Sequence, residues 1–240
     1  MFKNIVRVLL IMCIIMSCAS TAKQTDATVQ TSEEDFEIIQ NSKGTITIVN
    51  YVGESQHVVI PSIIGNVEVT EIDNRAFSNK NLLSVFIPEG IITVGKNAFS
   101  HNSGITTLII PNSVKTIEES AFSSNQLKSL TFGNQLTTIG NDAFSYNQLK
   151  EVNIPPSVTT IGNDAFATNP LERINIPSSV TRIGNYAFDG NNFLAIEIGA
   201  NKAYVTTSVG FEESFVNFYI NAQNRRAGTY VKNGRIWSLK

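Results

Sequence analysis

A pair of residues, alanine followed by phenylalanine, recurs through the middle of this chain at an almost constant spacing. The six occurrences are Ala76-Phe77, Ala98-Phe99, Ala121-Phe122, Ala143-Phe144, Ala165-Phe166 and Ala187-Phe188. The spacing is 22 residues, with a single step of 23 residues before the third pair. A fixed period of this length is typical of a chain that coils with a constant number of residues per turn, so the sequence predicts a solenoid.

Each repeat contains two short segments that are typical of β-strands. In the unit 127–144, Leu130 and Phe132 alternate with polar residues, which is the period of a half-buried strand, and Leu136-Thr-Thr-Ile139 is a second extended segment. The Gly-Asn-Asp-Ala-Phe stretch that follows predicts a tight corner of one helical turn. Coils stacked about 4.8 Å apart then form two parallel sheets, with the Leu, Ile and Phe side chains inside.

Asparagine recurs with the same period at one corner of the predicted coil, at Asn125, Asn147, Asn169 and Asn191. A buried asparagine there can hydrogen-bond the backbone groups of the turn and connect to the next coil. None of the four begins an Asn-x-Ser/Thr sequence, so they are not glycosylation sites.

The repeat pattern L-x-x-L-x-L-P…I-G-x-x-A-F resembles the BspA-like, or treponemal-type, leucine-rich repeat over residues ~57–199. Two positions depart from it, Gly133 in place of proline and Glu118 in place of glycine, and both are expected at the surface. The resemblance implies a mainly β fold: a right-handed leucine-rich-repeat solenoid of ~22-residue coils with two parallel sheets and terminal caps. It also implies a surface or envelope protein that adheres to host matrix or to other cells.

The first residues are typical of an export signal, with Lys3 and Arg7 before the apolar run Val8–Met16, which is far shorter than the ~20 residues that span a bilayer. The run ends in Ile-Met-Ser-Cys, which resembles a bacterial lipobox and makes Cys18 the expected lipid attachment site. The alternative is ordinary signal-peptidase cleavage near residues 19–22. Lipoproteins of this type carry more than one acyl chain, enough for stable membrane anchoring.

The predicted organisation follows from these features. We expect a signal peptide over 1–17, a flexible tether over 18–35, an N-terminal cap with an irregular first coil over 36–72, the solenoid over 73–199 and a helix and hairpin cap over 200–240.

Both caps have signals of their own. Two extended runs, 36–39 and 45–51, flank a turn and predict a hairpin at the front, and Asn233-Gly234 predicts another at the back. Between the solenoid and the second hairpin, Phe211, Phe215, Phe218 and Tyr219 fall on one face of a helix. The alternative for this aromatic cluster, with Arg225, Arg226, Lys232 and Arg235 nearby, is a ligand pocket.

The composition gives little indication of catalysis or of nucleic-acid, metal or cofactor binding. The formal net charge of −2 gives no basic surface for nucleic acid, and the only cysteines, Cys13 and Cys18, precede the folded body. The two histidines, His57 and His101, fall on different coils, and no catalytic motif is present. We therefore expect no enzyme activity, cofactor, metal or small-molecule substrate. Asp142 and Asp164 stack at one-coil spacing and could hold Ca²⁺, but capping of the corner turn is the favoured interpretation.

A contact surface is easier to identify. Outward positions of the first strand of each coil become polar along the chain, from Phe86 and Ile109 at the start to acidic Glu197 at the end. The candidate partner-binding residues are Phe86, Ile109, Thr131, Asn153, Asn175, Glu197, Glu151 and Arg173. Phe86 and Ile109 are the predicted anchor, because neighbouring apolar side chains in water indicate contact with a partner. The alternative is that the N-terminal cap covers them.

The export signal and lipobox-like sequence predict a lipid-anchored protein of the bacterial envelope, and the family resemblance implies that it faces outward from the outer membrane and binds host extracellular-matrix or bacterial surface proteins. The alternative is a lipoprotein that faces the periplasm and has a structural or scaffolding role.

Overall fold

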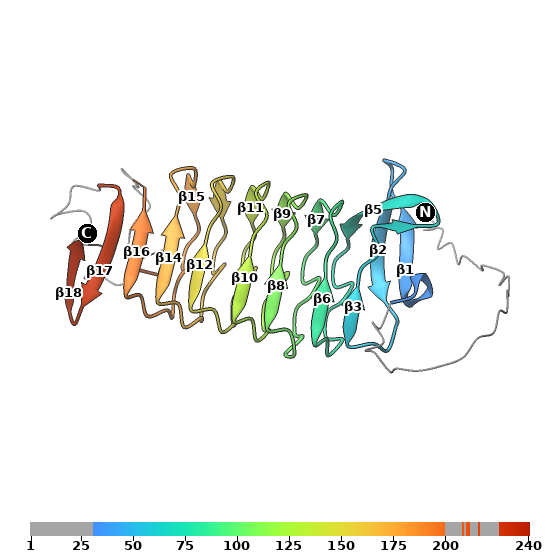
Figure 1. Ribbon diagram of the computed structural model, residues 1–240, viewed down its shortest axis with the longest axis horizontal. Coiled ribbons are helices and arrows are strands. Elements are labelled where there is room, and N and C mark those ends of the chain that lie inside the picture. Colours follow the sequence, from blue (N-terminus) through green and yellow to red (C-terminus); the bar gives the residue numbers. More distant parts are fainter. Residues whose placement is uncertain (1–30, 200–207, 209, 212–215, 217–225) are drawn as a thin grey trace, which may run out of the picture.

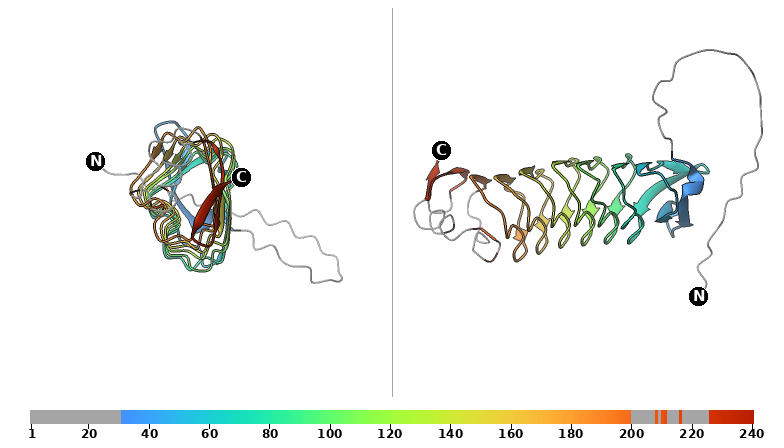
Figure 2. Two further views of the ribbon diagram at one scale, coloured as in Figure 1. Left: turned by 90° about the vertical axis from the view of Figure 1, so that its left-hand side faces the viewer. Right: turned by 90° about the horizontal axis from the view of Figure 1, so that it is seen from below.

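The computed structural model describes residues 31–199, 208, 210–211, 216 and 226–240. They form an elongated solenoid whose coils superpose when viewed end-on (Figures 1 and 2). The predicted signal peptide, Cys18, most of the predicted tether, and Phe215, Phe218 and Tyr219 of the predicted helix lie outside the described residues. In the described part of the chain, no helix has the length and apolar character needed to cross a bilayer.

The first strand of each coil contributes to one side of the solenoid. These strands are β3 (His57–Val59), β6 (Ser84–Phe86), β8 (Thr107–Ile109), β10 (Ser129–Thr131), β12 (Glu151–Asn153), β14 (Arg173–Ile176) and β16 (Ala195–Ile198). They pair in parallel in three sections, β3 with β6, β8 with β10, and β12 with β14 and β16. Their outward surface is called the strand face below.

The second, two-residue strands form one continuous sheet on another side of the coil. They are β7 (Thr93–Val94), β9 (Thr116–Ile117), β11 (Thr138–Ile139), β13 (Thr160–Ile161) and β15 (Arg182–Ile183), which follow β5 (Val67–Ile72) in parallel. In each, the aliphatic residue points inward and the preceding residue points outward. The predicted parallel-sheet solenoid is confirmed.

The regularly spaced phenylalanine rings stack on one another along the solenoid axis. Successive rings of Phe77, Phe99, Phe122, Phe144, Phe166 and Phe188 lie 4.8 to 5.8 Å apart and nearly parallel. Tyr51 extends the stack at one end and Phe211 at the other. Each alanine of the pair is fully buried, and its carbonyl accepts a backbone N–H from the preceding coil. Tyr51 donates to Ala76, and a phenylalanine donates to each of the others, as Phe144 does to Ala165 at 2.8 Å. No coil could bury its ring alone, so stability comes from neighbours.

The corner before each Ala-Phe pair is not a helical turn, contrary to the sequence prediction. The residue before the pair has a left-handed backbone, with φ of 54° at Asp142 and 53° at Asp164, and a second left-handed residue follows four positions later, at Tyr146 and Thr168. Left-handed residues interrupt a right-handed helix. The backbone N–H of Asp142 donates instead to the Asn163 carbonyl of the next coil at 2.8 Å, so stacking fixes this conformation.

Close approach between coils explains the repeated glycine. A Cβ added at Gly162 would lie 2.5 Å from the backbone nitrogen of Asn141 in the preceding coil. A Cβ at Gly133 would lie 2.3 Å from the Pro111 carbonyl oxygen, and Gly133 is buried, so the expectation that this position is at the surface is wrong. Glu118, the other departure, is half-buried.

Hairpins lie at the two ends of the described solenoid. At the front, β1 (Phe36–Gln40) pairs antiparallel with β2 (Ile46–Tyr51), preceded by the short 3₁₀ turn η1 (Glu33–Asp35), and β4 (Ile63–Ile64) pairs with β5. At the back, β17 (Gly228–Asn233) pairs antiparallel with β16 and with β18 (Ile236–Leu239). Both hairpins form where the sequence predicts them, whereas the wider domain boundaries remain a prediction.

Candidate interaction face

The asparagine column forms a hydrogen-bonded ladder inside the solenoid. The Asn147 amide nitrogen donates to the carbonyls of Phe122 at 3.0 Å and Phe144 at 3.1 Å, and its Oδ1 accepts the backbone N–H of Leu127 at 3.0 Å. The same pattern recurs at Asn102, Asn125, Asn169 and Asn191. The predicted structural role is confirmed, but each residue connects to the preceding coil rather than to the next one. These asparagines hold the strands in place and are not part of a contact surface.

The strand face carries two parallel columns of outward side chains. Strand register aligns Ser129 with Thr107 and Thr131 with Ile109, and further along aligns Glu151 with Arg173 and Asn153 with Asn175. The structure therefore brings the predicted partner-binding residues onto one surface, on successive coils. Strand alternation explains this arrangement, because every second residue of a strand points to the same side.

Exposed apolar side chains gather at the N-terminal part of the strand face. Phe86 is 60% exposed and Ile109 is 64% exposed, so no described residue of the N-terminal cap covers them. Val59 is 44% exposed and lies directly opposite Phe86 in the register of β3 and β6. Val59, Phe86 and Ile109 are called the apolar patch below. Sequence reasoning missed Val59 because the first coil is irregular, although its place before Ile60-Pro61 matches that of Phe86 before Ile87-Pro88.

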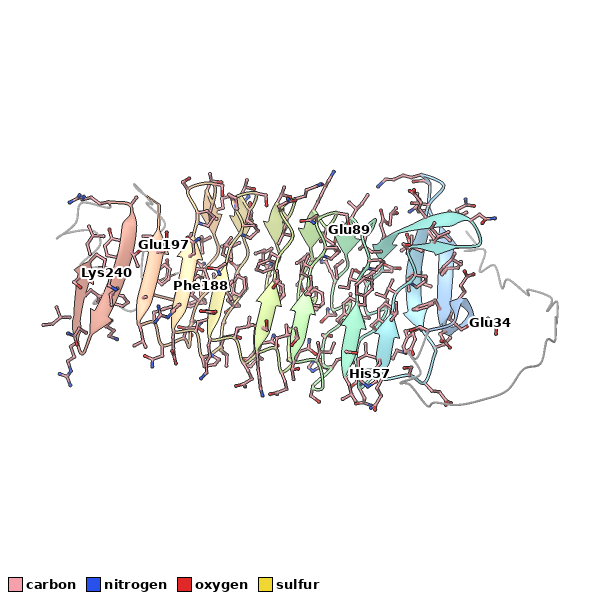
Figure 3. The ribbon with its side chains drawn as sticks, viewed as in Figure 1. Glu34, His57, Glu89, Phe188, Glu197 and Lys240 are labelled. Atoms are coloured by element: carbon pink, nitrogen blue, oxygen red, sulfur yellow. The ribbon has the colours of Figure 1, made fainter. Side chains whose placement is uncertain are left out.

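The C-terminal part of the strand face is polar and charged. Glu151 and Arg173 are exposed neighbours across β12 and β14, and Glu197 lies on β16 (Figure 3). In the described part of the chain, the ion pairs within 4 Å are Lys43–Glu71 and Lys96–Glu119. Glu151 and Arg173 therefore do not form a short ion pair with each other, and both charges are accessible to a partner.

The opposite, threonine-bearing face is suited to strand pairing. Thr137, Thr159 and Thr181 donate their hydroxyls to carbonyls of the preceding coil. The hydroxyls of Thr137, Thr159 and Thr181 are therefore used within the fold. An open groove of about 770 Å³ runs along this side, lined by β9, β11, β13 and β15 and by corner residues that follow these strands, among them Glu118, Asn141 and Asn163.

Asp142 and Asp164 do not cap the corner turn as predicted. The neighbouring asparagines instead link the corners of successive coils: Oδ1 of Asn141 accepts the backbone N–H of Asn163 at 2.9 Å, and Oδ1 of Asn163 accepts that of Asn185 at 2.8 Å. Partial burial, and then the Asp164 carboxylate, raises the pKa of Asp142 above its ordinary value. Within the described ranges, no group of three or more His, Cys, Asp and Glu side chains is placed to hold a metal ion.

The histidines lie apart on different coils. The Nδ1 atom of His57 is 2.8 Å from the hydroxyl oxygen of Ser84, and both residues are exposed at the edge of the strand face. His101 is exposed on a corner turn with a left-handed backbone. The structure thus does not assemble these two groups into one site.

Comparison with known proteins agrees with this geometry. The family model of the BspA type leucine-rich repeat region matches this chain in six copies over residues 70–195, which is more than half of the chain. No curated protein matches the chain.

Several solved structures share the fold. A leucine-rich repeat protein of T. pallidum is 27% identical with a TM-score of 0.64, over 67% of this chain and 78% of that one. One from Bacteroides ovatus is 27% identical with a TM-score of 0.55, over 67% of this chain and 44% of that one. A leucine-rich cell surface protein from Faecalibacterium prausnitzii, 24% identical with a TM-score of 0.51, covers 89% of this chain and 61% of that one, and shows the fold alone.

Proposed function

This chain belongs to the BspA type leucine-rich repeat family, and on that premise we propose that it is a non-enzymatic, adhesin-like protein that binds another protein through its strand face. The observation that carries the proposal is the apolar patch, in which large side chains on adjacent coils are exposed to water. Soluble monomers rarely leave such side chains grouped together unless they contact a partner.

The strand face has the layout of a protein-binding surface. Its apolar patch would supply the contacts that exclude water, and Thr131, Asn153 and Asn175 beyond it offer hydrogen-bonding side chains. Glu151, Arg173 and Glu197 would add orientation, because charges at the rim of an interface contribute more to specificity than to affinity. Repeat proteins generally bind through an extended surface of this kind.

The proposed location is the bacterial envelope, with the protein anchored through a lipid on Cys18 and the solenoid facing outward from the outer membrane. Support comes from the lipobox-like sequence Ile-Met-Ser-Cys and from the basic residues and apolar run that precede it. The proposed partners are host extracellular-matrix or bacterial surface proteins. If the solenoid faces the periplasm instead, the same face would serve a scaffolding role there.

Protease accessibility tests the location. Digestion of the protein on intact cells is the expected result, with a periplasmic protein intact in the same sample as the control. Protection until the outer membrane is opened would contradict the outward-facing proposal and direct the search to periplasmic partners.

Substitution of the anchor tests the face. The double variant Phe86→Ser with Ile109→Ser should weaken binding to a captured partner at least about tenfold, since central apolar anchors dominate interface energies. The matched control is Ile63→Ser with Tyr146→Ser, which removes two equally exposed apolar residues outside the strand face. Both variants should fold, as judged by circular dichroism. Unchanged partner affinity in the first variant would show that the apolar patch is not the anchor.

A further inference from the structure

The two ends of the described solenoid carry opposite charge. Residues 31–56 contain five acidic side chains and one basic side chain, and residues 226–240 contain four basic side chains and no acidic one. The acidic end is defined by Glu33, Glu34, Asp35, Glu37 and Glu54. The basic hairpin is defined by Arg226, Arg235 and Lys240, while Lys232 lies over the Trp237 ring, 5.9 Å from its centroid. The overall formal charge of −2 conceals this asymmetry.

The acidic end and the basic hairpin of one molecule cannot neutralise each other. Glu34 and Lys240 lie at opposite ends of the molecule (Figure 3), separated by six Ala-Phe coils, or roughly 30 Å at about 4.8 Å per coil. That distance exceeds the Debye length of about 8 Å at physiological ionic strength several times over. Lys43, the one base of the acidic end, is engaged by Glu71 at 3.4 Å.

Among the described residues, each end also carries the last strand of a sheet. β1 is the last strand of the nine-stranded sheet, and β18 is the last strand of the five-stranded sheet. Exposed edges favour association with another chain, and charged side chains commonly limit it. Apolar surface accompanies both edges: Ile236 beside the hairpin turn is 72% exposed, and Val52, after β2, is 49% exposed.

The charges determine which ends of two copies can come into contact. Two acidic ends repel each other, and so do two basic hairpins, whereas an acidic end attracts a basic hairpin. We propose that copies of this chain associate end to end, with the acidic end of one copy against the basic hairpin of the next. The contact joins different surfaces on the two partners, so it is heterologous and leaves both outer ends of a row free to add further copies.

Charge reversal in the full chain tests this association. Sedimentation velocity in nonionic detergent should show concentration-dependent species larger than a dimer, which dissociate when salt shortens the Debye length. Glu33→Lys with Glu34→Lys, and separately Arg235→Glu with Lys240→Glu, should each weaken association at least about tenfold, because each places like charges in contact. Lys128→Glu with Lys150→Glu is the matched control, since it changes the net charge as the second pair does but lies mid-solenoid, and it should change nothing.

Mixing the variants gives the sharpest result. An equimolar mixture of the two reversed variants should associate again, because each reversed end now meets an opposite charge on the other variant. A monomeric wild-type chain, a closed dimer that grows no further, or a mixture that stays dissociated would each overturn the proposal. These outcomes are independent of the strand face, whose substitutions leave both ends intact.

Discussion

Removing one rung of the asparagine ladder should destabilise the solenoid far more than its size suggests. We consider Asn147→Ala, in the middle of the repeat array. The Asn147 side chain is 2% exposed and donates to the carbonyls of Phe122 and Phe144 while accepting the N–H of Leu127. Alanine would leave the Leu127 N–H without its side-chain partner in a place that water does not reach, whereas the Phe122 and Phe144 carbonyls would each keep one asparagine donor, Asn125 and Asn169.

The magnitude follows from the number of groups affected. The unpaired Leu127 N–H costs about 1–3 kcal/mol, and each of the two lost hydrogen bonds to carbonyls costs about 0.5–1.5 kcal/mol, of which partial relaxation recovers some. We therefore expect Asn147→Ala to lower the free energy of unfolding by about 2–4 kcal/mol, a large share of the roughly 5–15 kcal/mol that keeps a typical domain folded. Asn153→Ala is the matched control: Asn153 is exposed on β12, and its loss should change stability by less than about 0.5 kcal/mol.

The assay is urea unfolding followed by circular dichroism, with the wild type, Asn147→Ala and Asn153→Ala measured together. Because repeat arrays need not unfold in one step, amide hydrogen exchange provides a local measurement, and the Leu127 amide should exchange much faster in Asn147→Ala. A loss of stability below about 1 kcal/mol, with the protection of the Leu127 amide unchanged, would refute the reasoning. It would mean that the hydrogen bonds of Asn147 to the backbone do not stabilise the fold.

Two further variants test the core and the corner. Phe144→Ala should lower the free energy of unfolding in urea by about 3–5 kcal/mol, because it removes a fully buried ring that stacks on both neighbouring rings. Tyr146→Ala, at an exposed position of the same corner, should lower it by less than about 0.5 kcal/mol. Equal losses would contradict the role of the stack. Asp142→Asn should raise the melting temperature at pH 7, because partial burial and the Asp164 carboxylate raise the pKa of Asp142 in the fold and penalise its ionised form. That gain should vanish as the pH falls below the ordinary value of 3.8, where Asp142 is neutral in both states; a gain that persists at pH 3 would contradict this cause.

The features that repeat in the sequence are those that sequence reasoning predicted well. A period of 22 residues stacks Ala143-Phe144 and the equivalent pairs along the solenoid axis. Strand alternation then places the side chains of Thr131 and Asn153 on the outer surface. The corner conformation was predicted wrongly because the residues that adopt it, such as Arg75 and Tyr186, share no side-chain property. Their left-handed backbone is imposed by hydrogen bonds between coils, which local sequence does not encode.

The candidate face was only partly predictable for a related reason. Phe86 and Ile109 lie in regular coils and could be placed by counting from the Ala-Phe pair, but Val59 precedes the first such pair and lies in an irregular coil. The side chain that accepts a backbone N–H at this corner is Asn141 rather than Asp142, and the N–H belongs to Asn163 of the next coil. Both residues are common caps, and which of them faces the neighbouring coil depends on the backbone conformation that stacking sets.

The uniform contact between coils has a consequence for how this molecule can change in length. From Phe99 to Phe188 each interior coil offers the same ring and the same pair of carbonyls to its neighbours. Deleting residues 145–166 would therefore bring Phe188 onto Phe144 and Asn169 into the place of Asn147, with no new packing problem to solve. The number of coils is a property that recombination between repeats can alter in whole units, lengthening or shortening the molecule's outer surface while both of its ends stay as they are.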